Sequence, residues 1–292
     1  MDVLQEAVIV AAIYYNRSSW HELIKFINPL LKEAHKNGIL DTYYINFGLN
    51  GGDHIKLILK PSGNGNEFEK ETGLLIKQFL LGNPSETRGI EYPLNTFFMD
   101  HPNNSVRFYQ TNESTFFNSI AYKDSEDMRW QISQALLEAF GSEEIDLASI
   151  YTFISYMQIG ILKAAYPDIK LAQAKSTDLI CYLNELKDLE EVETDIRGEK
   201  DNQYFKQLFE ENQDILLEIV RDIWEPGGAD SELKWMEVWE AACKNFLTGV
   251  DFKSSFILLS NLVYEQIGFM HNKNSVRLSL KLISASFRTG GR

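Results

Sequence analysis

His54 and Lys56 are the two residues whose types and spacing most favour chemistry. They lie in the run His54 to Lys60, whose apolar and polar residues suggest a β-strand. Because side chains two residues apart share one face of a strand, an acid–base group and a cation are expected side by side, with aliphatic side chains on the other face. On the pattern alone, a solvated strand edge carrying a histidine and a lysine is an equally good interpretation.

The preceding run, Thr42 to Phe47, adds two more polar groups. Tyr44 and Asn46 share one face of this run, and the glycines between the two runs can adopt the positive φ angles of a hairpin connection. We therefore predict an antiparallel pair, which brings the four polar groups together if the register aligns them. The sequence does not fix that register.

Most standard catalytic signatures are absent from the sequence. It contains no Walker loop, dinucleotide-binding glycine fingerprint, His-Glu-x-x-His motif or Gly-x-Ser-x-Gly elbow. The histidines at 21, 35, 54, 101 and 271 show no metal-ligand spacing, and the two cysteines support neither a disulfide framework nor a zinc site. We expect no metal and no cofactor. The histidines at 21 and 35 are predicted to be exposed on the first helix.

The charge of the chain argues against two classes of partner. Lys and Arg number 28 against 42 Asp and Glu, so the formal net charge is −14, which repels nucleic-acid phosphates and anionic lipids. No apolar run reaches the roughly 18 residues of a membrane span, and no signal peptide is evident. The expectation is a cytoplasmic protein that binds neither nucleic acid nor membrane.

The elements that must position these residues begin with strands. Strands are predicted at 7–15, 42–47, 54–60 and 106–110. A helix is expected from Ser19, whose spacing to Glu22 is that of a capping box, to a left-handed stop at Gly38. Prolines and glycines accumulate between Gly82 and Asn104, which predicts a long irregular loop.

The rest of the chain has helical periodicity. Helices are expected at 126–140, 147–165, 171–187, 202–224, 231–247 and 252–271. Strands first and helices afterwards predict an α+β fold, in which an N-terminal antiparallel sheet with flanking helices is followed by a mostly helical C-terminal layer. We expect a single domain over 1–292, with a sheet-containing lobe at 1–125 and a helical lobe at 126–292.

Four short motifs, in order along the chain, resemble one protein family. They are Tyr43 to Phe47 followed by Gly51 to Leu57, then Val106 to Tyr109, then Phe116 to Ser125, and finally Phe269 to Leu278. Together they are similar to the C-terminal elimination domain of class I lantibiotic dehydratases, which also occurs as free-standing thiopeptide-type bacteriocin biosynthesis proteins. The motifs span almost the whole chain.

The departures from the family pattern bear on the reaction. In the dehydratases this domain eliminates glutamate from glutamylated Ser or Thr, and conserved arginines would stabilise the developing negative charge. Here Asn46 replaces the arginine of the first motif, and Lys56 and Ile58 replace the two of the next strand. A neutral amide offers no cationic clamp, and lysine does not reproduce the guanidinium fork. Ordinary glutamate elimination is therefore disfavoured.

The free-standing relatives include thiopeptide pyridine synthases. The resemblance to them implies a formal 4+2 cycloaddition of two dehydroalanines, which forms the pyridine core and macrocycle of a thiopeptide with loss of the leader peptide. That chemistry depends on positioning and proton transfer more than on ionic force. Two alternatives remain: a glutamate-eliminating subunit of a split dehydratase, and a non-catalytic leader-binding scaffold.

The same resemblance assigns roles to residues of the motifs. The catalytic candidates are His54, Tyr44, Arg107 and His271. The substrate-binding candidates are Asn46, Lys56, Tyr109, Asn274 and Arg277. The expected partner is a dehydrated precursor peptide with its leader, and other enzymes of the same pathway are candidate partners.

Overall fold

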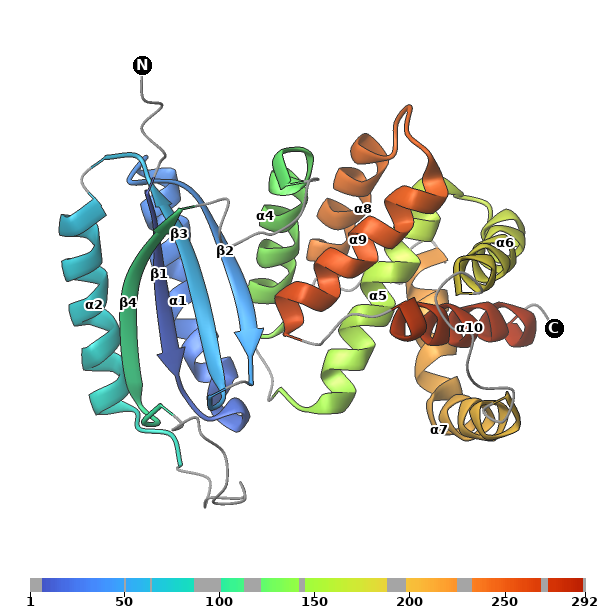
Figure 1. Ribbon diagram of the computed structural model, residues 1–292, viewed down its shortest axis with the longest axis horizontal. Coiled ribbons are helices and arrows are strands. Elements are labelled where there is room, and N and C mark those ends of the chain that lie inside the picture. Colours follow the sequence, from blue (N-terminus) through green and yellow to red (C-terminus); the bar gives the residue numbers. More distant parts are fainter. Residues whose placement is uncertain are drawn as a thin grey trace. The chain divides into compact units, whose positions relative to one another are not determined.

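Four antiparallel strands carry the predicted site. They are β1 (Ala7–Tyr14), β2 (Leu40–Gly48), β3 (His54–Pro61) and β4 (Ser105–Asn112), in the order β2-β3-β1-β4 (Figure 1). The predicted hairpin is confirmed, because β2 pairs with β3 antiparallel. β3 lies in the interior of the sheet, so the interpretation of its polar residues as a solvated edge is wrong.

The computed structural model describes residues 7–49, 51–63, 65–86, 101–112, 122–141, 145–187, 198–224, 233–268 and 273–290. Its internal contacts divide the chain into two units. The first comprises Met1–Leu147 with Gln266–Phe269, and the second comprises Ala148–Glu265 with Met270–Arg292.

Two helices cover the aliphatic face of the sheet. Helix α1 (Trp20–Lys36) packs Trp20 on Phe47 of β2, with ring centroids 4.8 Å apart. Helix α2 (Gly65–Gly82) approaches β4 so closely that a β-carbon on Gly73 would lie 3.2 Å from the Phe108 ring. Figure 1 shows α1 behind the sheet and α2 alongside β4. The aliphatic side chains of the strands are therefore enclosed.

The start of α1 differs from the prediction. Ser19 makes no side-chain capping bond, so the predicted capping box does not form. The chain is already wound into a 3-10 turn, Arg17–Ser19, before α1 begins, and Asn16 caps that turn by accepting a hydrogen bond from the Ser18 amide. Glu22 instead accepts a hydrogen bond from the Tyr15 hydroxyl. Gly38 does adopt the left-handed conformation expected after the helix, with φ of 69°.

Helix α2 was not predicted, because its leucines do not form one apolar stripe. Leu74 and Leu81 are 61% and 83% exposed, whereas Ile76 and Leu80 are buried. The irregular loop predicted from Gly82 to Asn104 falls mainly on residues 87–100, which lie outside the described residues.

Helix α4 (Tyr122–Ala139) completes the first unit and packs against β2, the edge strand. The Ile45 amide donates to the Ser133 hydroxyl at 3.0 Å, and the Gln266 amide nitrogen lies 3.2 Å from the Ile45 carbonyl oxygen. These bonds satisfy backbone groups that a sheet edge leaves unpaired. The outer edge of β2 is therefore held in place by side chains.

The second unit is helical. Its elements are α5 (Leu147–Ala165), α6 (Ile169–Lys187), α7 (Gly198–Trp224), α8 (Lys234–Phe246), α9 (Phe252–Ile267) and α10 (Lys273–Gly290). The predicted helices are found, but the last one ends at Ile267 rather than at 271, because Gly268 takes a φ of 79°. Helix α10 was not predicted. A sheet followed by helices confirms the α+β class.

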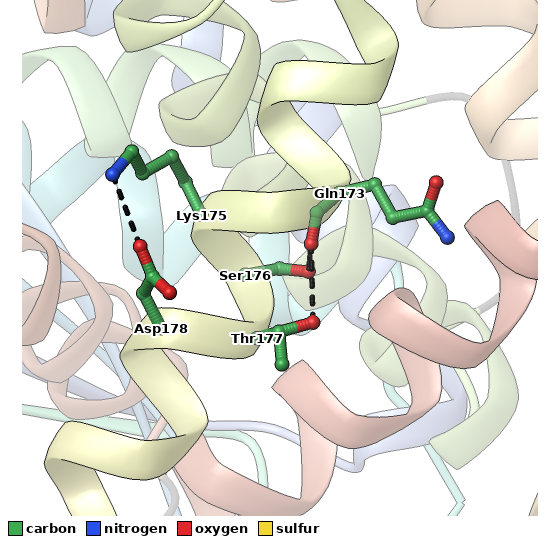
Figure 2. Close-up of polar contacts among 5 residues, drawn as sticks. All are labelled: Gln173, Lys175, Ser176, Thr177 and Asp178. Atoms are coloured by element: carbon green, nitrogen blue, oxygen red, sulfur yellow. Dashed lines mark hydrogen bonds and ion pairs between the residues drawn. The ribbon is translucent and has the colours of Figure 1, made fainter.

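Two buried side chains of this unit donate hydrogen bonds to backbone carbonyls. The Ser176 hydroxyl is fully buried and donates to the Gln173 carbonyl at 2.7 Å, one turn earlier in α6 (Figure 2). The Trp239 indole donates to the Met157 carbonyl at 2.9 Å, and a β-carbon on Gly160 would lie 2.9 Å from the same indole. Among the described residues, no helix is long and apolar enough to cross a membrane.

Candidate functional site

The strand register places six of the predicted residues on one face of the sheet. Asn46 lies opposite Lys56, Lys56 opposite Ala12, and Ala12 opposite Arg107, which makes one row across four strands. A neighbouring row contains Gly48, His54, Tyr14 and Ser105, and the next contains Tyr44, Ile58, Val10 and Tyr109. Opposite residues share a face. The register that the sequence left open therefore aligns the polar groups of the hairpin with those of β4.

His54 is enclosed rather than exposed, since its side chain is 2% accessible. Its Nδ1 lies 2.7 Å from the Gly52 carbonyl oxygen, and its Nε2 is buried with no hydrogen-bond partner among the described residues. Burial lowers the pKa of His54, and the charge of Lys56 lowers it further against the opposing effect of the Gly52 bond. The ring is consequently held neutral at physiological pH, in a form that suits proton acceptance.

Tyr14 and His101 extend this part of the site, although neither was in the predicted set. The Tyr14 ring lies near two imidazoles, 5.1 Å from His54 and 4.4 Å from His101 by ring centroids. The His101 amide donates to the Gly51 carbonyl at 2.9 Å, which ties the segment before β4 to the hairpin turn. Burial raises the pKa of Tyr14, while the charge of Arg107 opposes that rise.

Lys56 and Asn46 provide a cation and an amide at the centre of the face. Lys56 is half-buried, and burial lowers its pKa. The Oδ1 atom of Asn46 is buried and has no partner among the described residues. The Lys56 ammonium and the side-chain NH2 group of Asn46 can each donate to a carbonyl or carboxylate oxygen of a ligand, whereas the unpartnered Oδ1 can accept from a ligand N–H.

Arg107 and Tyr109 lie on the edge strand and are more accessible. Arg107 is exposed, and Tyr109 is 41% exposed. Burial raises the pKa of Tyr109, and the nearby Tyr14 raises it further. The polar face therefore runs from enclosed groups on β3 to exposed groups on β4.

Tyr44 faces a different set of partners. Its hydroxyl donates to Oε1 of Glu126 on α4 at 2.9 Å, and the Lys60 ammonium lies 3.9 Å from the same oxygen. A pocket of about 370 Å³ opens beside these groups, lined by His35, Asp41, Thr42, Lys60, Glu126, Asp127 and Trp130. Tyr44 shares the sheet face with His54, but its hydroxyl is directed toward α4.

The predicted C-terminal residues are not brought to this face by any described contact. His271 lies outside the described residues, as does the side chain of Asn274 in the first turn of α10. The Arg277 guanidinium donates to Asn184 at 3.3 Å within the second unit. His35, which was expected to be exposed, is half-buried with its Nδ1 3.2 Å from the Leu40 carbonyl oxygen. His21 is half-buried too.

No group of three or more His, Cys, Asp or Glu side chains in the described part of the chain is arranged to hold a metal ion. Cys181 is exposed and Cys243 is buried, and both are free thiols.

Comparisons with known proteins find similar folds among solved structures. No protein-family model and no curated protein sequence matches the chain. Among solved structures, it is similar to "Pyridine synthase, TbtD, from thiomuracin biosynthesis", with a TM-score of 0.61 and 11% identity over 96% of this chain and 97% of that one. It is also similar to TsrL, with a TM-score of 0.52 and 12% identity over 98% and 95% of the two chains.

A third structure is the tRNA-dependent lantibiotic dehydratase MibB from Microbispora sp. 107891, with a TM-score of 0.48 and 10% identity. The alignment covers 97% of this chain and 28% of MibB. The likeness to the first two structures confirms, at the level of fold, the resemblance expected from the motifs.

Proposed function

We propose that the protein is a peptide-maturation enzyme that joins two dehydroalanines of a precursor peptide into the pyridine of a thiopeptide. The observation that carries the proposal is the fold likeness to a pyridine synthase over nearly the full length of both chains. The polar sheet face supports it, because this face joins an enclosed neutral imidazole to amide and ammonium donors.

The reaction makes three demands on the protein. An amide must become its hydroxyl-imine tautomer, which supplies the azadiene. Two carbon–carbon bonds then form between the azadiene and the second alkene. Finally water and the leader peptide leave, which makes the ring aromatic. The first step moves a proton from nitrogen to oxygen, and the middle step requires the two alkenes to be held together. The last step removes two hydrogens from ring carbons, one as water leaves and one as the leader leaves with its terminal amide.

The candidate roles follow from the chemistry of each group. His54 offers a neutral ring nitrogen that can accept the amide hydrogen. Lys56 and Asn46 offer N–H donors to the amide oxygen, which gains electron density as the tautomer forms. Arg107 and Tyr109, at the accessible edge, offer donors to peptide carbonyls. Tyr44 and His271 remain proposed participants in proton transfer, and Asn274 and Arg277 remain proposed contacts to the peptide.

Mass spectrometry of a dehydrated precursor peptide tests the proposal. Ring closure is expected to remove the mass of water and release the whole leader peptide. Loss of glutamate from a glutamylated substrate would instead identify an eliminating subunit of a split dehydratase. Binding of the precursor without any mass change would identify a leader-binding scaffold, and either result would overturn the proposal.

Leader dependence is a second test. A flexible peptide must be oriented by contacts remote from the reacting alkenes, so binding energy from the leader is needed in the transition state. A core peptide that lacks its leader is expected to lose nearly all turnover. Equal turnover of the full-length and leaderless peptides would contradict the proposed mode of substrate recognition.

A further inference from the structure

The imidazole of His54 occupies the space in which a side chain at position 48 would lie. Gly48 and His54 are directly opposite each other in the β2 and β3 pair. Opposite residues normally place their β-carbons about 4.5 to 5.5 Å apart. Here a β-carbon on Gly48 would lie 2.3 Å from Nε2 and 2.5 Å from Cε1 of the ring. Ordinary contacts between non-bonded carbon atoms begin at about 3.5 Å, so only a glycine at position 48 leaves room for the His54 ring.

The hairpin turn holds the other side of the same ring. A carbonyl oxygen only accepts hydrogen bonds, so the 2.7 Å contact from Nδ1 to the Gly52 oxygen requires the hydrogen on Nδ1. In a neutral imidazole the lone pair is then on Nε2. Gly52 has a φ of 107°, which other residues rarely adopt. Gly48 therefore leaves room for the Nε2 side of the imidazole, and Gly52 supplies the carbonyl oxygen that binds Nδ1 on the opposite side.

We infer that Gly48 is a positioning residue for His54, and that together with the Gly52 carbonyl it fixes the imidazole as the Nδ1-protonated tautomer with Nε2 as the accepting atom. The Nε2 atom is buried and has no donor among the described residues. Burying an acceptor without a donor costs free energy, and a ligand that supplies the donor recovers it.

The inference rests on the proposed function in one respect, which is the identity of that donor. A dehydrated peptide presents amide N–H groups beside its alkenes, and the amide hydrogen is the one that leaves when the azadiene forms. The group that meets Nε2 is therefore an amide N–H of the substrate rather than a carbonyl or carboxylate.

NMR of the full chain tests the positioning without any substrate. Long-range proton–nitrogen spectra of nitrogen-labelled protein report the tautomer, with the His54 signals assigned through His54→Gln. The wild type is expected to show the Nδ1-protonated form above pH 7, and Gly48→Ala a mixture of both tautomers. The matched control is Gly63→Ala, because an added β-carbon there has nothing within 4 Å. A wild-type ring protonated on Nε2, or an unchanged Gly48→Ala pattern, would overturn the inference.

A stability comparison applies even if Gly48→Ala folds poorly. Without the imidazole, an added methyl group meets no ring. The double variant Gly48→Ala with His54→Ala is therefore expected to unfold at about the temperature of His54→Ala alone. In the presence of the ring, Gly48→Ala is expected to lower the melting temperature by several degrees. An equal loss in both backgrounds would show that position 48 acts independently of His54, contrary to the inference.

Turnover provides the functional readout. Gly48→Ala is expected to lower kcat for ring formation while KM stays near the wild-type value, and Gly63→Ala is expected to change neither. A Gly48→Ala enzyme with wild-type kcat would exclude the positioning role in this reaction. Failure of the wild type to form a pyridine would count against the proposed function alone, because the NMR and stability measurements use no substrate.

Discussion

The Tyr14 ring lies 4.4 Å from the imidazole of His101, at an interplanar angle of 55°. The contact joins the end of β1 to the segment that leads into β4, and it places His101 close enough for its charge to lower the pKa of His54. Without the charge of His101, this lowering of the His54 pKa is lost. We expect His101→Ala to raise the pKa of His54 toward 6.5, as measured by NMR titration of the ring. A His54 titration that does not move would exclude electrostatic coupling between the two histidines.

His54→Ala is expected to affect both activity and stability. A positioned acid–base group contributes about 100- to 10,000-fold to a rate, so product formation in single-turnover experiments is expected to fall by that order. Because the side chain is 2% exposed, its removal is also expected to cost about 1 to 3 kcal/mol in the free energy of unfolding. Wild-type turnover by a folded His54→Ala protein would remove this residue from the mechanism.

The hairpin was predictable because its signals are local. Alternation within 42–47 and 54–60, with glycines between them, identifies both strands and the faces of Tyr44, Asn46, His54 and Lys56. The burial of His54 was not predictable, because it depends on β1 lying on the other side of β3, a pairing between segments far apart in the sequence. The same long-range pairing brings Tyr14 and His101 to the site.

Two other departures have causes that the spacing of residue types does not reveal. The helix predicted to reach residue 271 stops at Ile267, because the chain turns at Gly268 to approach β2. A glycine inside an apolar helical pattern is compatible both with a helix that continues and with a helix that ends there, and tertiary contacts decide between the two. The capping box at Ser19 and Glu22 had the right spacing, but the preceding 3-10 turn took over the capping role through Asn16.

The lowered pKa of His54 predicts how stability depends on pH. Its native pKa lies below the ordinary value of 6.5, so the unfolded chain binds the proton first as the pH falls. The stability contributed by the neutral ring is fully present above about pH 6.5 and is lost as the pH decreases through the native pKa. Melting temperatures from pH 8 to pH 5 are expected to fall more steeply for the wild type than for His54→Gln. Parallel curves would contradict this.

Lys56→Met is expected to separate function from stability. Burial lowers the pKa of Lys56, which shows that the charged form is disfavoured at its position. A methionine of similar length removes that penalty, so the free energy of unfolding is expected to equal or exceed that of the wild type. Turnover is expected to fall about 100-fold, the typical effect of losing one donor to a developing oxyanion.

Lys60→Met is the matched control for that change, because Lys60 lies on the same strand face but next to Glu126. Turnover of Lys60→Met is expected to remain near the wild-type value. If the two lysine variants lost equal activity, a specific role for Lys56 would be excluded, and a general requirement for positive charge would explain the loss.

Gly268→Ala and Gly249→Ala separate backbone strain from steric contact. Both glycines have positive φ angles, of 79° and 78°, but an added β-carbon on Gly268 would lie 2.1 Å from the Phe47 carbonyl oxygen, whereas on Gly249 it would have nothing within 4 Å. The left-handed conformation alone costs about 1 to 2 kcal/mol, and forcing atoms into occupied space adds about 1 to 3 kcal/mol.

We therefore expect Gly268→Ala to be the more destabilising of the two in chemical denaturation. It is also expected to loosen the outer edge of β2, so the Ile45 amide, which donates to Ser133, should exchange its hydrogen faster than in the wild type. Gly249→Ala is expected to leave that exchange rate unchanged. Equal destabilisation by the two changes, with Ile45 exchange unaltered, would show that the approach of Gly268 to Phe47 does not hold β2 in place.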